Sequence, residues 1–113
     1  MLQRNQDFGT VFLQGQHIQN EYFSIFFVKE EELCVGFTTK KDYKSKPTRN
    51  RMKRILRELW RKNFRKYLLP AHIVIVARMN ILKEKHEHLD NLMNAALTEM
   101  EKKLNALRLE QEK

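Results

Sequence analysis

In the first half of the chain, the side chains follow the two-residue period of β-strands, in which successive residues point to opposite faces. Residues 22–28 are aromatic and β-branched, a composition that favours a strand. Alternation predicts two partly apolar faces, with Tyr22, Ser24 and Phe26 on one and Phe23, Ile25 and Phe27 on the other. Residues 33–39 predict a second strand, and the polar turn at 29–32 indicates a hairpin between the two. Gly36 in the second strand indicates a bulge or a close backbone approach.

The second half of the chain changes to helical spacing. A helix is expected to begin at Ser45 or Pro47 and to run to about residue 68, because proline is tolerated in a first turn and Pro70 ends the pattern. At 100° per residue its apolar arc has Trp60 and Phe64 at one border and contains Met52, Ile55, Leu56, Leu59 and Tyr67. A last helix, capped by Asn80, carries Leu89, Leu92, Met93, Ala96, Met100, Leu104 and Leu107 at helical spacing.

Two shorter patterns complete the fold. Asn5 or Asp7 can cap a short helix that carries Phe8, Val11 and Phe12 and ends at Gly15. Residues 71–77 form a continuous apolar run of the kind that makes a buried strand. The predicted order is helix, strand, strand, a possible further strand, helix, strand, helix. This order predicts an α+β sandwich in which three helices pack on a sheet of about four strands.

Length and composition then narrow the class of protein. A chain of 113 residues predicts one domain, residues 1–113, whose helical end from about residue 104 either projects from the packed part or frays. The net charge of +8 is concentrated in residues 40–66, which points to nucleic acid or an anionic membrane surface as a partner. No run approaches the ~18 apolar residues of a membrane span, and the N-terminus does not resemble a signal peptide. We therefore expect a cytoplasmic protein without a membrane partner.

The middle helix carries its cations in register. Asn50, Lys53 and Arg57 follow one another at spacings of three and four beside the aromatic border, and Arg54, Arg61 and Arg65 lie further round. A solvated basic face would explain the spacing alone. The preference for arginine favours phosphate binding, because a guanidinium group binds phosphate through two parallel hydrogen bonds.

Motifs for other chemistries are missing from the sequence. The four histidines, His17, His72, His86 and His88, have no zinc-like spacing, and Cys34 in an apolar run is interpreted as a small core residue. Residues 30–32 are interpreted as a solvated acidic turn. The sequence therefore predicts neither a catalytic site nor a small-molecule substrate.

Several motifs, in order, make the chain similar to the protein subunit of bacterial ribonuclease P. They are Asp7-Phe8 with Val11-Phe12, the aromatic strand around Phe23 and Phe26, Val35-Gly36-Phe37-Thr38, Arg49-Asn50-Arg51 with Lys53-Arg54 and Leu56-Arg57-Glu58, and Ile73-Val74-Ile75-Val76-Ala77-Arg78. The loop at 42–48 and the short basic arm, reduced to Arg4, depart from the family pattern.

The resemblance implies a left-handed βαβ crossover, against the usual hand. It also implies a role in tRNA 5′ maturation as the non-catalytic subunit of an endoribonuclease. Its partners would be ribonuclease P RNA and the 5′ leader of precursor tRNA, and Mg²⁺ would be held mainly by the RNA. The alternative is a generic RNA-binding or ribosome-associated module without a processing role.

The same resemblance implies two groups of site residues. The leader would lie in a cleft between the first helix and the sheet. The residues that line this cleft or its rim would be Phe12, Phe26, Thr38, Asn50, Lys53 and Arg57. The phosphates of the RNA subunit would contact Arg49, Arg51, Arg54, Arg61 and Arg65.

Overall fold

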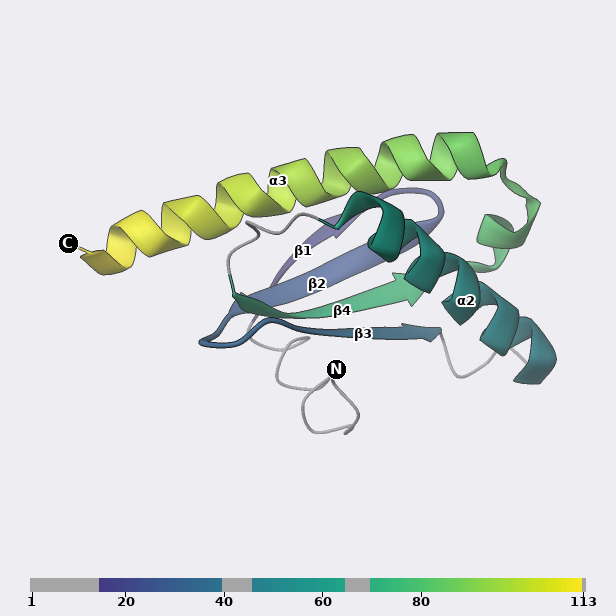
Figure 1. Ribbon diagram of the computed structural model, residues 1–113, viewed down its shortest axis with the longest axis horizontal. Helices are drawn as coiled ribbons and strands as arrows, with labels where there is room; N and C mark the ends of the chain where they lie inside the picture. The colour runs from purple at the N-terminus through teal and green to yellow at the C-terminus, as the bar shows by residue number, and fades with distance from the viewer. Residues whose placement is uncertain (1–14, 40–45, 65–69, 113) are drawn as a thin grey trace.

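A computed structural model describes residues 15–39, 46–64 and 70–112. The helix expected near the N-terminus lies, up to residue 14, outside the described residues. The described elements, in chain order, are β1 (Gln16–Gln19), β2 (Phe23–Lys29), β3 (Cys34–Thr39), α2 (Lys46–Asn63), β4 (Ala71–Ala77), the 3₁₀ helix η1 (Met79–Lys83) and α3 (His86–Glu112). Figure 1 traces them along the chain. The three predicted strands are confirmed to within a residue. The possible further strand was expected after the second of them, whereas the fourth described strand, β1, precedes β2.

The four strands form one mixed sheet in the order β1-β2-β4-β3. β2 is antiparallel to both β1 and β4, whereas β3 is parallel to β4. The predicted hairpin between β2 and β3 is therefore wrong, because β4 lies between them. The central place of β4 follows from its composition, since a strand that is apolar on both faces is stabilised most where neighbours cover both of its edges and faces.

The connection from β3 through α2 to β4 has an uncommon hand. In Figure 1 both strands point to the right, β4 lies above β3, and α2 crosses in front of the sheet. A connection that returns in front of the sheet and then moves upward is left-handed. Nearly all parallel β-crossover-β connections are right-handed. The left-handed crossover predicted from the family resemblance is therefore confirmed.

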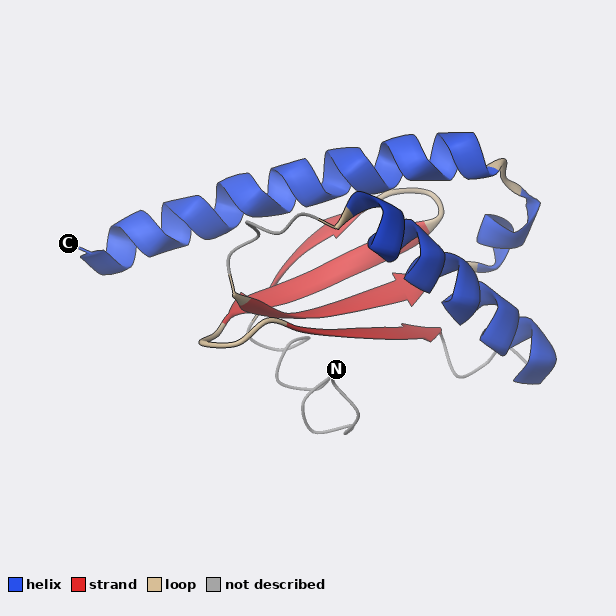
Figure 2. Ribbon diagram, in the orientation of Figure 1, coloured by secondary structure: helices blue, strands red, loops and turns tan. Residues whose placement is uncertain are grey.

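The main core lies between one face of the sheet and the two described helices (Figure 2). Phe23, Ile25 and Phe27 of β2 pair in register with Ala77, Ile75 and Ile73 of β4, and all six are at most 1% exposed. The residues of α2 and α3 that cover them are Met52, Leu56, Leu59, Trp60, Leu89, Met93, Ala96, Leu97, Met100 and Leu104. The predicted apolar faces of both helices are therefore confirmed for the described side chains, with Ile55 and Leu92 half-buried and Leu97 as an addition.

The ends of the helices differ in part from the prediction. The described part of α2 ends at Asn63, whose side chain donates to the Leu59 carbonyl at 2.8 Å and so takes a backbone acceptor at the helix end. Tyr67 lies outside the described residues. Asn80 does not cap α3. It lies in η1 and donates to the Glu21 carbonyl at 2.8 Å, while α3 begins six residues later at His86. Figure 1 shows the C-terminal part of α3 extending past the sheet.

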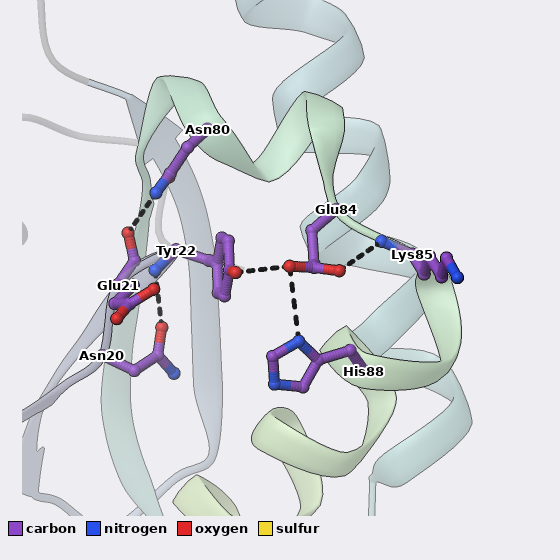
Figure 3. A network of polar contacts seen from close by, with 7 residues as sticks. All are labelled: Asn20, Glu21, Tyr22, Asn80, Glu84, Lys85 and His88. Atoms are coloured by element: carbon purple, nitrogen blue, oxygen red, sulfur yellow. Dashed lines mark hydrogen bonds and ion pairs between the residues drawn. The ribbon is translucent and has the colours of Figure 1, made fainter.

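A polar network joins the β1–β2 turn to the start of α3 (Figure 3). The Tyr22 hydroxyl donates to Glu84, which also accepts from the Lys85 backbone N–H at 2.8 Å and lies 3.3 Å from His88 Nδ1. The hydrogen bond to Glu84 raises the pKa of Tyr22 to about 12, and the same bond, with the Lys85 N–H, lowers the pKa of Glu84. Tyr22 precedes β2 and packs against the main core, so its predicted place beside Phe26 is wrong.

Candidate nucleic-acid interface

The cationic side of α2 is a rigid surface. The helix has no acidic residue in its first turn, while its apolar side is anchored in the core by Met52, Leu56 and Leu59. Five of the predicted site residues on it are exposed, namely Asn50, Arg51, Arg54, Arg57 and Arg61, and two are half-buried, namely Arg49 and Lys53. Arg65 lies outside the described residues. A folded backbone therefore holds these cations at fixed spacings.

Three of these arginines surround a shallow hollow of about 280 Å³. Arg54, Arg57 and Arg61 line it together with Glu58. Three guanidinium groups around one carboxylate leave a net positive site, and guanidinium groups bind phosphate oxygens through two parallel hydrogen bonds. The hollow is therefore suited to a phosphate group of a polyanion. Glu58 was not among the predicted site residues, although its spacing of four from Arg54 places both on one side of the helix.

Arg57 also contacts the sheet. Its guanidinium carbon lies 5.9 Å from the centroid of the Phe37 ring on β3, within the range of a cation–π interaction. The sequence placed Arg57 at the rim of a groove and Arg54 and Arg61 on a separate outward face. The structure places Arg57 at the edge of the sheet and also in the same hollow as the other two.

Arg49 carries a buried hydrogen-bond donor in its side chain. Its side chain is half-buried, and its Nε atom is buried without a hydrogen-bond partner in the described part of the chain. A buried N–H group that lacks an acceptor costs free energy, because it has lost its hydrogen bonds to water. A ligand oxygen that reached this N–H would remove that cost.

A second apolar surface covers the sheet face that points away from α2. Val74 at its centre is fully buried, and Phe26, Val28, Cys34 and Val76 pack half-buried around it. Both faces of β2 are therefore apolar, as the sequence predicted. The partial burial of Cys34 in this cluster agrees with its interpretation as a small packing residue.

The register arranges this face in rows across the strands. One row runs His17, Phe26, Val74, Gly36, and the next runs Gln19, Ser24, Val76, Thr38. The continuous register of β3 shows no bulge at Gly36, which is buried. Because glycine has no side chain, the face of the sheet is less raised at Gly36, between Val74 and the sheet edge.

The predicted leader-binding residues thus lie on two sides of one sheet edge. Phe26 and Thr38 are half-buried on the face away from α2, while Asn50, Lys53 and Arg57 belong to α2 beside β3. Phe12, expected to line the opposite wall of the cleft, lies outside the described residues. The described part of the chain therefore supplies one apolar wall and one cationic rim.

Two aromatic contacts in this region were not predicted. His17 stacks on Phe26 with ring centroids 5.7 Å apart and planes inclined by 26°. Phe64 packs against Trp60 at 5.5 Å, and its side chain is 40% exposed. The helical arc placed Phe64 only at the border of the core, and His17 could not be assigned because the sequence pattern did not locate β1.

Within residues 15–39, 46–64 and 70–112, no three histidine, cysteine, aspartate or glutamate side chains gather as a metal site would require. In the same ranges no helix combines the length and hydropathy needed to span a membrane.

Comparison with known proteins covers most of the chain. Residues 1–101 match the family model described as Ribonuclease P. The chain is 34% identical over 93 residues to the ribonuclease P protein component of Thermotoga petrophila, covering 79% of this chain and 77% of that protein. It is 30% identical over 94 residues to the ribonuclease P protein component of Alkaliphilus metalliredigens, covering 81% and 85%.

Solved structures have the same architecture. The RNase P protein from Thermotoga maritima superposes with a TM-score of 0.71 at 26% identity, over 86% of this chain and 94% of that one. The RNase P protein of Staphylococcus aureus superposes with a TM-score of 0.72, over 86% and 91% of the two chains. At 20% identity the second likeness concerns the fold alone.

Proposed function

Because this chain belongs to the ribonuclease P protein family, we propose that it is the protein component of a bacterial ribonuclease P ribonucleoprotein and supports the 5′ maturation of tRNA. Family membership, predicted from the order of the sequence motifs, is confirmed. In this role the chain is the non-catalytic subunit of a tRNA-processing endoribonuclease, and its RNA partner performs the hydrolysis. Transcription and processing of bacterial tRNA occur in the cytoplasm, so the proposal places the chain there.

One observation supports RNA binding most directly. Arg54, Arg57 and Arg61 line one hollow on a helix that the core holds rigid. Phosphate contacts of this kind position a protein on RNA without reading its sequence. We assign the phosphates of the RNA subunit to Arg49, Arg51, Arg54, Arg61 and Arg65. The buried Nε of Arg49, which has no hydrogen-bond partner among the residues that the structure describes, adds a donor to this surface.

The 5′ leader is assigned to the sheet edge. Phe26 and Thr38 offer a half-buried, largely apolar floor on one face of the sheet, and Asn50, Lys53 and Arg57 offer polar and cationic groups across the edge, on α2. Apolar platforms flanked by cations hold single-stranded nucleic acid with little sequence preference. This property suits leaders of varied sequence. Phe12 completes the assignment from the family resemblance.

We further propose that Mg²⁺ binds mainly to the RNA. Metal ions and arginines both reduce repulsion between RNA phosphates, so the basic side of α2 lowers the Mg²⁺ concentration that the folded RNA requires. The protein then assists the chemistry through electrostatics without coordinating the metal.

The test is reconstitution. We expect the purified chain, added to a bacterial ribonuclease P RNA at low Mg²⁺, to increase the rate of leader cleavage. It should also make the complex bind leader-bearing tRNA more tightly than leaderless tRNA. A basic protein of similar size and charge serves as the control. Unchanged cleavage would overturn the proposal, and equal affinity for the two tRNAs would identify a general RNA-binding module instead.

A further inference from the structure

We propose that Phe64, supported by Trp60 at the C-terminal end of α2, is a stacking platform for one unpaired base of the RNA partner. The inference rests on the proposed function, which supplies the RNA. It adds a contact to a base, whereas the arginines of α2 contact phosphates.

The geometry of Phe64 makes a flat and supported surface. The Phe64 backbone N–H donates to the Trp60 carbonyl at 2.7 Å, so the chain keeps its helical path just beyond Asn63. The Phe64 and Trp60 ring centroids lie 5.5 Å apart, with the planes inclined by 38°. Trp60 is only 9% exposed and belongs to the main core, whereas Phe64 is 40% exposed. One side of Phe64 is thus held by the core while part of its ring remains open to solvent.

The surroundings of Phe64 favour a polyanion over another protein. Phe64 follows Arg61 by three residues and Arg57 by seven, so helical spacing places all three along one side of α2. Arg57 and Arg61 line the cationic hollow, and Lys62 beside them is exposed. A second copy of this chain would bring the same positive charges together and be repelled. RNA supplies the opposite charge and a flat apolar group at once.

The combination matches the physics of single-stranded nucleic-acid binding. Cations hold the backbone, and an aromatic face beside them stacks on a base. Any of the four bases has a π-face, so the platform would select an unpaired nucleotide by shape and not by identity. Phosphates held in the hollow by Arg57 and Arg61 would place the adjoining base over Phe64.

The experiment measures the affinity of the full chain for ribonuclease P RNA with Phe64 varied. Phe64→Ala should weaken binding roughly 5- to 150-fold, the range for loss of one stacked base. Because phenylalanine neutralises no phosphate, the dependence of affinity on salt should keep its slope. Phe64→Tyr should bind like the wild type, while Phe64→Leu, which keeps apolar area without a π-face, should resemble the alanine variant.

Trp60, the only tryptophan of the chain, provides a direct signal. RNA binding should quench its fluorescence in the wild type and much less in the Phe64→Ala variant. Met79→Ala is the matched control, because Met79 is a comparably exposed large apolar side chain, 42% exposed, and lies outside α2. It should leave affinity and quenching unchanged.

Three results would overturn the platform while leaving the proposed function intact. They are wild-type affinity in Phe64→Ala, equal binding by the leucine and tyrosine variants, and a change in oligomeric state on sedimentation of Phe64→Ala. A wild-type chain that binds no ribonuclease P RNA would instead overturn the proposed function, and this inference with it.

Discussion

At the residue scale, Arg57 connects the two surfaces assigned to RNA. Its guanidinium group lies over Phe37 at the sheet edge and also lines the hollow formed with Arg54 and Arg61. Helical angles alone placed Arg57 and Arg54 in separate groups, because a helical wheel gives the direction in which each side chain leaves the helix but not how far its end group extends. A long arginine side chain covers a wide arc, and its head position depends on what it packs against.

Arg57→Ala should weaken affinity for ribonuclease P RNA and reduce the slope of log affinity against log salt by about one, the effect of one lost phosphate contact. Arg57→Lys should restore the slope but only part of the affinity, because lysine keeps the charge and loses the paired hydrogen bonds. Binding at several salt concentrations measures both. Lys102→Ala removes one exposed charge from α3 and is the matched control. An unchanged slope for Arg57→Ala would remove this residue from the interface.

At the element scale, the sequence predicted what each segment is better than which segments are neighbours. Residues 71–77 were recognised as a strand because the run is apolar on both faces. The same property explains why β4 lies at the centre of the sheet. The hairpin expected between β2 and β3 was inferred only from their closeness in sequence. Pairing is decided by the burial gained over the whole sheet, and β4 gains more between β2 and β3 than at an edge.

The two faces of β4 should differ in their contribution to stability. Ile75 is fully buried between β2, β3 and the helices, and Val76 is half-buried on the opposite face. Ile75→Ala should lower the free energy of unfolding by about 2–5 kcal/mol, because it leaves a cavity in the core. Val76→Ala should cost distinctly less. Urea unfolding with an unchanged m-value would measure both, and equal losses would contradict the assignment of the main core to the α2–α3 face.

At the scale of the whole molecule, segments far apart in sequence complete the fold. Tyr22 and Glu84 lie 62 positions apart, and their hydrogen bond ties the β1–β2 turn to the segment before α3. Strand alternation placed Tyr22 beside Phe26, but Tyr22 precedes β2 and its side chain packs against the main core. No local pattern marks such a pair, because the residues around each partner in the sequence carry no information about the other.

This bond predicts how stability changes with pH. The lowered pKa of Glu84 contributes stability that is present above its ordinary value of 4.5 and is lost as the pH falls through the folded pKa. The pKa of Tyr22 is raised from 10.0 to about 12. The stability that Tyr22 contributes is therefore complete below pH 10 and is lost as the pH rises towards 12.

Tyr22→Phe should therefore lower the thermal midpoint most at neutral pH, and the difference from the wild type should shrink in both the acid and the alkaline window. Glu84→Gln is the companion variant. It should remove the part of the loss of stability at acid pH that comes from protonation of the Glu84 carboxylate. Thermal unfolding across the pH range measures both effects. A difference between wild type and Tyr22→Phe that stays constant with pH would show that the hydrogen bond does not carry the linkage.

The sequence by itself determined β2, β3, β4, the two described α-helices, the basic side of α2 and the family, because these depend on periodicity, side-chain chemistry and motif order along the chain. It also divided the side chains of β2 correctly between two apolar faces. Only the tertiary structure decided the strand order, the sharing of one hollow by Arg54, Arg57 and Arg61, and the exposure of Phe64 beside Trp60. These features depend on which surfaces are buried together, and burial is a property of the packed molecule that no single segment carries.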